Sequence, residues 1–486
     1  MFLFDPSEVA MLRASSWLAS LRHWLACVLA MSSMALASTA FAQTDGGTGG
    51  GTGGTGNTIG ASEFAGVAVD AEGVLQRRAV NDPTGQLMRT RLEQAEATLG
   101  DVAKSSELRK VSLTRLIAAV GQALENGGPD EEMRHLAGLT RIRYVFYYPE
   151  TKDIVLAGPA EGWVETPDGR VVGFETGRPV MLLEDLAAAL RTFAPGGKKN
   201  PLVYCSIDPT PEGLARMQQF LSQIGRQIGP GDEQFIVDGL RESLGLQTIT
   251  VGGVPASTHF AQVMVEADYR MKLIGIGLEQ PPVNILSFVA LANPAQIARN
   301  ALQRWYFVPD YKRIKVAADG LAAEFVGPGV KLVGEDEVVS EHGGRQSVAV
   351  QSPASRKFTQ SFTKMYGELA ERAPVYGQLR NCIDLLVAAA FIQQHDWYAA
   401  AGIDLGALGD EQAYSIETYN APKQVATAVN SMWKGRRLMT PVGGGVEIRA
   451  SKAVAAENTL ADDGSVAEAR AGIDLKSLPA DRWWWD

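Results

Sequence analysis

The stretch that decides the fold is GGVPASTHFAQVMVEADYRMKLIGIG, which runs from Gly252 to Gly277. Its first residues are typical of a turn, and Ser257 and Thr258 are candidate N-caps. The apolar residues that follow recur at the spacing of one helical face. They are Phe260, Val263, Met264, Ala267, Met271 and Ile274. The sequence therefore predicts a helix that packs this face against a core.

The charged residues of this helix have a structural explanation. Glu266 precedes Arg270 by four residues, and Asp268 precedes Lys272 by the same spacing. An acid four residues before a base is the favourable order for an ion pair on a helix surface, worth roughly 0.2–0.5 kcal/mol. We therefore expect a core helix with a solvated, charged face, and not a catalytic helix. In its first turn, a neutral imidazole is expected at His259.

Similar units flank this helix along the chain. LVYCSIDPTPEGLARMQQFL (202–221) predicts a strand, a proline turn and a helix that Thr210 caps. LQTITVGG (246–253) predicts a strand before the central helix, and VNILSFVALANP (283–294) predicts a third strand or a buried helix. Successive strand–turn–helix units favour a mixed sheet with some parallel strands, covered by helices.

The expected fold class is α/β to α+β. Residues 61–300 form the α/β domain, in which RYVFYYPETKDIVLAG (143–158) and GWVETPDGRVVG (162–173) predict β-hairpins. Residues 301–450 form a smaller region of antiparallel strands, with helices at 358–370 and 375–395. Residues 451–486 form a low-complexity tail. Its tryptophans, Trp483, Trp484 and Trp485, dock on the domain or on a partner, and docking on the domain is the favoured interpretation.

The first residues predict export. Arg13 and Arg22 precede an apolar run, and AFA (40–42) supplies a small-x-small cleavage motif. This pattern is typical of a signal peptide over 1–42, cleaved after Ala42, which implies a periplasmic or extracellular protein. A disordered linker rich in Gly and Thr follows over 43–60. After removal of the signal, no further apolar run long enough to cross a bilayer is expected.

The net charge limits the kinds of partner that we expect, and the sequence around each cysteine indicates whether it is buried. The 55 acidic and 45 basic residues give a formal net charge of −10, which argues against nucleic acid as a partner. The expected partner is a protein or a small anionic ligand of the cell envelope. Cys205 and Cys382 lie on apolar faces and are predicted to be buried thiols, the usual environment of a free cysteine. A Cys205–Cys382 disulfide is the open alternative.

Three segments carry a resemblance to a known family. They are GRVVGFETGRPVMLLEDLAAALR (169–191), CSIDPTPEGLARMQQFL (205–221) and HFAQVMVEADYRMKLIGIGLE (259–279). This part of the chain, from about residue 145 to 279, resembles a family of exported bacterial proteins catalogued as a domain of unknown function. The resemblance implies that these segments form one unit, and it implies no catalytic residue.

Candidate catalytic groups are few. Cys205 with His259 is the one thiol–imidazole pairing that we name, and Asp208 or His259 is the candidate general base. His135, His259, His342 and His395 are scattered and show no metal-ligand spacing. No nucleotide-binding loop is present in the sequence, so we expect neither a metal nor a cofactor.

A ligand crevice is predicted from position alone. If the strand–turn–helix units form parallel strands, their following loops meet at one edge of the sheet, where helix N-termini offer N–H groups to an anion. Turn and capping chemistry explains the same residues without a ligand. The residues of this predicted crevice are Asp208, Thr210, Gly252, Gly253, Ser257, Thr258, His259 and Asn293. The sequence thus favours an exported envelope binding or interaction protein without catalysis, and a hydrolase that uses this crevice is the alternative.

Overall fold

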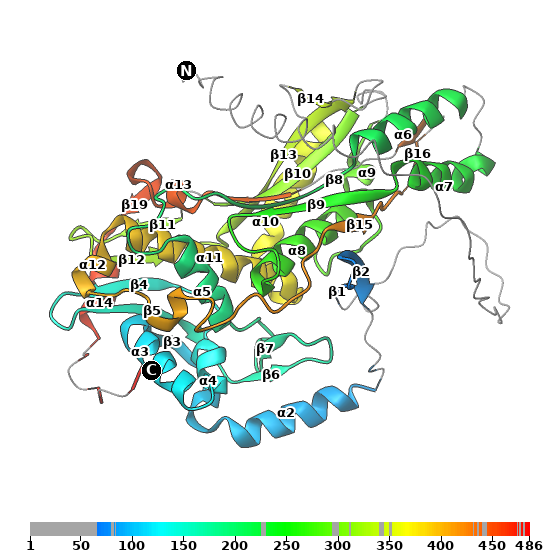
Figure 1. Ribbon diagram of the computed structural model, residues 1–486. Coiled ribbons are helices and arrows are strands. Elements are labelled where there is room, and N and C mark those ends of the chain that lie inside the picture. Colours follow the sequence, from blue (N-terminus) through cyan, green and yellow to red (C-terminus); the bar gives the residue numbers. More distant parts are fainter. Residues whose placement is uncertain are drawn as a thin grey trace, which may run out of the picture. The chain divides into compact units, whose positions relative to one another are not determined.

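The computed structural model describes residues 66–78, 82, 84–224, 230–293, 301–310, 313–339, 345–348, 352–430, 432–434, 437–439, 445–473, 475, 478–479 and 482–486. All of these residues belong to one compact unit. The predicted signal peptide (1–42) and linker (43–60) lie outside the described residues. Within them, two large sheets combine parallel and antiparallel pairs, so the predicted mixed α/β fold is confirmed (Figure 1).

The larger sheet, here the first sheet, has nine strands among the described residues. In order across the sheet they are β1 (Gly66–Val69), β2 (Val74–Arg78), β15 (Gln424–Ala426), β9 (Leu246–Gly252), β8 (Val203–Asp208), β18 (Gly445–Ile448), β10 (Ala301–Pro309), β13 (Val330–Val339) and β14 (Arg345–Val348). The pairs β15–β2 and β10–β18 are parallel.

The prediction of parallel strands is wrong for β8 and β9, which pair antiparallel from Tyr204 with Gly252 to Asp208 with Thr248. The reason lies in two helices between them, α6 (Pro211–Ile224) and α7 (Glu233–Leu244), which pack on each other around a small core of their own. A single crossover helix carries the chain back to the end of the sheet at which the first strand began, so the next strand runs parallel. Two helices in succession return the chain to the end at which the first strand finished, so the next strand runs antiparallel.

The second sheet has seven strands in the part of the chain that the structure describes. Their order is β19 (Thr459–Ala461), β11 (Ile314–Val316), β12 (Ala322–Phe325), β4 (Tyr144–Tyr148), β5 (Asp153–Ala160), β3 (Ser106–Ser112) and β20 (Trp484–Trp485). In β4, Val145 and Tyr147 face the main core, whereas Tyr144, Phe146 and Tyr148 face a second core. Both faces of this sheet are therefore buried at its centre, in β4 and β5.

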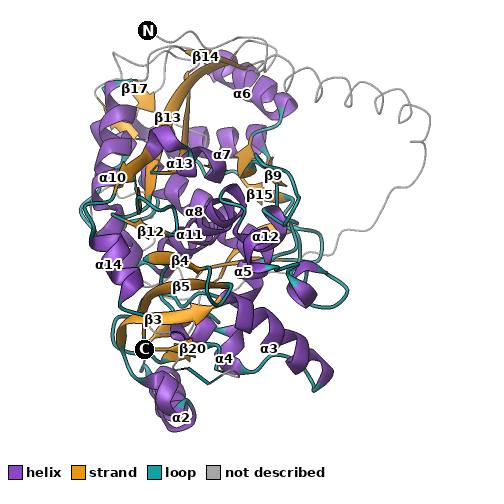
Figure 2. Ribbon diagram, turned by 90° about the vertical axis from the view of Figure 1, so that its left-hand side faces the viewer, coloured by secondary structure: helices purple, strands orange, loops and turns teal. Residues whose placement is uncertain are grey.

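Helices fill the space around and between the sheets. Besides α6 and α7 they are α2 (Gln86–Thr98), α3 (Leu113–Glu125), α4 (Glu131–Arg134), α5 (Leu183–Thr192), α8 (His259–Ile276), α9 (Phe288–Leu291), α10 (Pro353–Arg372), α11 (Pro374–Gln394), α12 (Trp397–Ala401), α13 (Ala450–Val454) and α14 (Ser465–Ala471). Helix α8 packs on β8 and β18, and α11 packs on α8 and α5. Figures 1 and 2 show α8 and α11 between the two sheets.

Helix α11 corrects one expectation. Among the described residues it is the helix long and apolar enough to cross a membrane, whereas the sequence was expected to hold no such run after the signal peptide. The whole of its apolar window is buried inside the protein. The length and composition of α11 therefore fit the central helix of a packed core.

Several predicted elements appear where the patterns placed them. The hairpins β4–β5 and β6 (Trp163–Glu165)–β7 (Val171–Gly173) are antiparallel, as predicted. A further short hairpin is formed by β16 (Met432–Lys434) and β17 (Arg437–Met439). The segment predicted as a third strand or a buried helix is instead a loop over 283–287 followed by the four-residue helix α9. The predicted strand is wrong, and the helix covers only part of the segment.

The chain is not partitioned at residue 300, the expected boundary between two domains. The first sheet takes β8 and β9 from before it and β10 and β18 from after it. The second sheet likewise joins β4 to β12. The expected tail supplies β19, α14 and β20, and its three tryptophans are each 7% exposed. Docking of these tryptophans on the domain is therefore confirmed.

Candidate functional site

Helix α8 is almost wholly buried. It is capped by Thr258, whose Oγ1 accepts a hydrogen bond from the Ala261 N–H, and it ends at Gly277 with a left-handed φ of 78°. Apart from His259 and Gln262, each residue of this helix is buried, and Asp268 is 0% exposed. The predicted solvated face is therefore wrong. Its charges lie inside the protein, where they pair with one another and with other segments of the chain.

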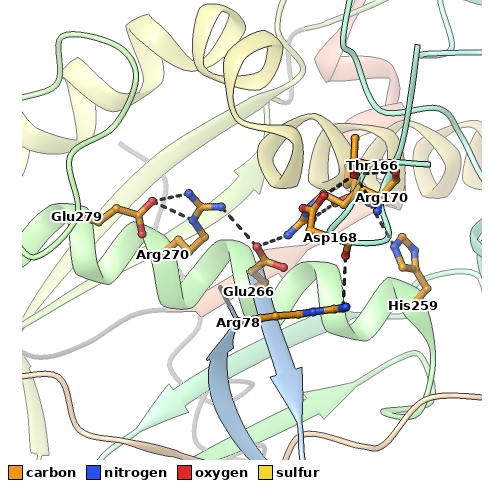
Figure 3. A network of polar contacts seen from close by, with 9 residues as sticks. Arg78, Thr166, Asp168, Arg170, His259, Glu266, Arg270 and Glu279 are labelled. Atoms are coloured by element: carbon orange, nitrogen blue, oxygen red, sulfur yellow. Dashed lines mark hydrogen bonds and ion pairs between the residues drawn. The ribbon is translucent and has the colours of Figure 1, made fainter. Parts of the chain in front are cut away.

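The centre of this polar network is Glu266 (Figure 3). Its Oε1 lies 2.5 Å from Nη2 of Arg170 and 3.5 Å from Nη1 of Arg270. Arg270 also donates two hydrogen bonds to Oε1 of Glu279, at 2.7 and 2.9 Å. The predicted i,i+4 pair is thus present, but inside the protein and shared with two further residues. Burial alone would lower the pKa of Arg270, but the charges of Glu279 and Glu266 outweigh it and raise that pKa.

Arg170 extends the network to the β6–β7 hairpin and to α11. It lies directly before β7, and its Nε is 2.9 Å from Oδ2 of Asp168 in the β6–β7 turn. Its Nη1 donates to Oε1 of Gln378 on α11. One guanidinium group therefore joins a hairpin, α8 and α11. Nothing in the sequence around Arg170 distinguishes it from a surface arginine beside a turn, so this contact was missed.

His259 forms the other end of the network. Its Nδ1 lies 2.9 Å from Oδ2 of Asp185 on α5, and its Nε2 lies 3.4 Å from Nε2 of Gln378. Burial would lower the pKa of His259, but the charges of Asp185 and Glu184 raise it to about 9. This pKa favours the charged imidazole at neutral pH, whereas the neutral form was expected. A charged, paired imidazole is a poor general base.

A second ion pair lies within α8, and its lysine connects the helix to the first sheet. Nζ of Lys272 lies 3.4 Å from Oδ2 of Asp268 and donates a 2.7 Å hydrogen bond to the carbonyl of Ile207 in β8. Burial raises the pKa of Asp268 to about 6, against the opposing charge of Lys272. Lys272 therefore fixes α8 on β8 by a side-chain hydrogen bond as well as by apolar packing.

The segment from β8 through α9 thus forms one continuous structure of two strands and four helices. Residues 205–288 match the family model of a protein of unknown function, DUF1598. No curated protein and no solved structure matches the chain. The matched residues hold β8, α6, α7, β9 and α8, so the DUF1598 segment contains the helix at the centre of the polar network. Its partners Arg170, Asp185 and Gln378 come from outside the match.

The predicted crevice is not assembled by the DUF1598 segment. Because β8 and β9 are antiparallel, Asp208 lies beside the beginning of β9, and Gly252 lies beside the beginning of β8. The predicted crevice residues therefore form two groups that lie at opposite ends of this strand pair. One group is Asp208 and Thr210, and the other is Gly252, Gly253, Ser257, Thr258 and His259. Asn293 follows α9 and is exposed.

The capping explanation accounts for several of these residues. Thr210 accepts a hydrogen bond from the Gly213 N–H at the start of α6, as predicted. Gly253 has a left-handed φ of 86°, and a Cβ there would lie 2.3 Å from the Leu202 carbonyl oxygen. Ser257 donates to Oε2 of Glu417 at 2.8 Å. Turn geometry and local hydrogen bonds therefore use the groups that a ligand would need.

Neither cysteine is a nucleophile in this structure. Cys205 and Cys382 are free thiols, 2% and 0% exposed, so burial is confirmed and the alternative disulfide is absent. Burial and the charge of Asp268 raise the pKa of Cys205 well above its usual range. Burial and the charge of Asp185 do the same for Cys382. An activated thiol needs an exposed, electropositive setting, and both environments are the reverse.

One open cavity of about 360 Å³ lies beside the C-terminal strand, lined by Glu132, Pro479, Arg482, Trp483 and Trp484. Glu132 accepts a 2.9 Å hydrogen bond from Nε1 of Trp484, and Arg482 lies over the ring of Trp484, 5.0 Å from its centroid. Among the described residues, no group of three or more His, Cys, Asp or Glu side chains has the arrangement of a metal site. The cavity therefore combines one anion, one cation and indole surface.

The position of this cavity depends on Arg109 in β3. Arg109 is 0% exposed and donates to both carboxylate oxygens of Asp486, at 2.8 and 3.1 Å. It also donates to the carbonyls of Val102, Lys104 and Ala137. The Ala137 backbone is left-handed, with φ 52°. Arg109 thus holds the C-terminal strand at the sheet edge, a contact across 377 residues that sequence spacing does not reveal.

Proposed function

We propose that this chain is an exported binding protein of the cell envelope that performs no catalysis. The observation that carries this proposal is that its reactive side chains are engaged inside the core. His259 lies between Asp185 and Gln378, and Cys205 is 2% exposed. The signal-peptide pattern over 1–42 supports export. The match to a family of unknown function is compatible with this proposal and adds no activity to it.

The binding site of this proposal is the cavity beside the C-terminal strand. Its carboxylate accepts a hydrogen bond from the edge of the Trp484 indole, and its guanidinium group lies over that ring. This arrangement suits a segment that offers both charges and an apolar side chain. A peptide segment of a protein partner has this chemistry. A small anion would pair with Arg482 alone, and the carboxylate of Glu132 would repel it.

The experiment is a selection of displayed random peptides on purified Gln43–Asp486, followed by binding measurements on the enriched peptides. We expect Arg482→Ala and Glu132→Gln each to weaken binding at least tenfold, since each removes one charge from the cavity. Glu132→Gln keeps an acceptor for the Trp484 indole. Arg241→Ala removes an exposed arginine on α7 and serves as the matched control.

The same preparation separates binding from hydrolysis. We expect no turnover of chromogenic carboxylic and phosphoric esters or of a fluorogenic peptide library. Turnover by the parent that disappears in Asp208→Asn or His259→Gln would establish the hydrolase alternative. Enriched peptides that bind the cavity variants as tightly as the parent would remove the cavity from the proposal.

A further inference from the structure

Four charged residues form a separate buried group, here the arginine cluster: Arg141, Arg313, Arg380 and Asp384. Arg141 precedes β4, Arg313 directly precedes β11, and Arg380 and Asp384 lie four residues apart on α11. Arg313, Arg380 and Asp384 are 1%, 3% and 0% exposed, and the Arg141 side chain is 20% exposed. Segments far apart in the sequence therefore bring three cations to one buried carboxylate.

The charges of the arginine cluster do not balance. Arg313 donates to Oδ1 of Asp384, and Nη2 of Arg141 lies 3.7 Å from Oδ2 of the same carboxylate. In the described part of the chain, no other carboxylate forms an ion pair with these three arginines. Three guanidinium cations thus face one anion, an excess of two positive charges. Buried charge of one sign is strongly unfavourable without a counterion.

The hydrogen bonds of the cluster are also incomplete. Five covered nitrogen atoms have no acceptor among the described residues, whereas one covered acceptor, Oδ2 of Asp384, has no donor within hydrogen-bond distance. The nitrogens are Nε of Arg141, Nε and Nη1 of Arg313, and Nε and Nη2 of Arg380. Burial and the charge of Arg141 lower the pKa of Arg380 to about 10. Buried N–H groups in proteins are nearly always bonded. A bound anion would neutralise the excess of positive charge and would also supply the missing acceptors.

A glycine turn covers the cluster. The Gly327 carbonyl accepts a 3.2 Å hydrogen bond from Nη2 of Arg141. A Cβ at Gly329 would lie 1.8 Å from Nη1 of Arg313, so this backbone rests directly on the guanidinium group. Gly327 and Gly329 both have left-handed φ angles, 71° and 79°. The turn closes the cluster from solvent on this side and contains residues that tolerate a change of backbone angle.

We propose that the arginine cluster binds a tetrahedral inorganic oxyanion, phosphate or sulfate, beneath the Gly327–Gly329 turn. Such an ion accepts several N–H bonds at once, and the guanidinium fork matches its oxygen spacing. A dianion cancels an excess of two charges. Because the free nitrogens are covered, the ion enters when the turn moves aside, and the partly exposed Arg141 meets it first. This site shares no residue with the cavity of the proposed function.

The test is thermal unfolding of Gln43–Asp486, Arg380→Met and Arg241→Met, each with sodium phosphate and with sodium chloride of equal ionic strength. We expect phosphate to raise the midpoint of the parent and of Arg241→Met by several degrees more than that of Arg380→Met. In phosphate-free buffer, Arg380→Met should melt at or above the parent, because methionine removes an unpaired buried cation.

Phosphate also stabilises proteins in general by its exclusion from their surface. Equal shifts in all three proteins would therefore overturn the proposal. If Arg380→Met does not fold, equilibrium dialysis of the parent against radiolabelled phosphate in excess chloride decides. Saturable binding of about one ion per chain, competed by sulfate, supports the site. Absence of saturable binding at millimolar phosphate means that water alone completes the cluster, and the proposal fails.

Discussion

At the scale of single residues, Glu266 illustrates how charged side chains are paired inside this protein. Its carboxylate is shared by Arg170 and Arg270, which also pair with Asp168 and Glu279 respectively. A buried ion pair contributes little net stability when complete, but removal of one partner costs about 3–5 kcal/mol. The network therefore specifies how the β6–β7 hairpin, α8 and α11 fit together more than it adds stability.

His259 gives this interior a pH dependence. Its pKa is raised from 6.5 to about 9, so the folded state holds the proton more tightly than the unfolded chain. The contribution is complete below pH 6.5 and is lost as the pH rises through 9, on the order of 3 kcal/mol in all. We expect His259→Gln to cost more stability at pH 6 than at pH 9.5. Urea unfolding of both proteins at the two pH values measures this difference.

A constant difference between parent and His259→Gln across this range would show that the imidazole is neutral in the folded protein. The comparison with a variant is necessary because Asp268 also titrates in the folded state. Its pKa is raised to about 6, so its protonation favours the folded state below that pH. Both proteins share this contribution, and it cancels in their difference.

At the scale of elements, the spacing of side chains predicted α6, α8, α10 and α11 and the hairpins β4–β5 and β6–β7. Local patterns suffice for these, because each depends on which residues of one segment face a core. The relative direction of β8 and β9 could not be predicted in this way. It depends on α7 and on the return of the chain, and the Gly239 contact with Phe220 that closes α6 on α7 has no local signal.

Two helical glycines give a matched prediction. A Cβ at Gly275 in α8 would lie 2.3 Å from Cζ3 of Trp305, whereas a Cβ at Gly121 in α3 would have no neighbour within 4 Å. We expect Gly275→Ala to destabilise the protein by about 1–3 kcal/mol, because the buried indole must move. We expect Gly121→Ala to stabilise it by about 0.5–1 kcal/mol. Denaturant unfolding of both variants checks the opposite signs, and a stabilised Gly275→Ala would contradict the packing of α8.

At the scale of the whole molecule, the two sheets join the beginning of the chain to its end. The strand and helix patterns indicated that the chain changes character near residue 300, but not that β18 and β10 complete the sheet of β8. The candidate site has the same limitation. Its α8 residues were identified from spacing, whereas Asp185, Arg170 and Gln378 contact them only through the tertiary fold. The arginine cluster had one local signal, two charges four residues apart in the apolar helix α11.

A shortened chain tests this interdependence. We expect residues 61–300 alone not to fold cooperatively, because β8 loses β18 and α8 loses its packing on α11. The near-ultraviolet circular dichroism of the fragment should be weak, and its thermal scan should lack the sharp transition of Gln43–Asp486. A cooperative transition in the fragment would restore the boundary at residue 300.

The pairing of β20 with β3 has a consequence for the order of folding. Ser112 of β3 donates its N–H to the carbonyl of Trp483, and Arg109 pairs with Asp486, which lies 377 residues later in the chain. At ordinary rates of synthesis, β3 leaves the ribosome roughly 20–75 s before this partner exists. Throughout that interval its edge is open to pairing with another unfinished copy. The fold thus favours folding after synthesis over folding during it, and β3 is the strand where premature association would begin.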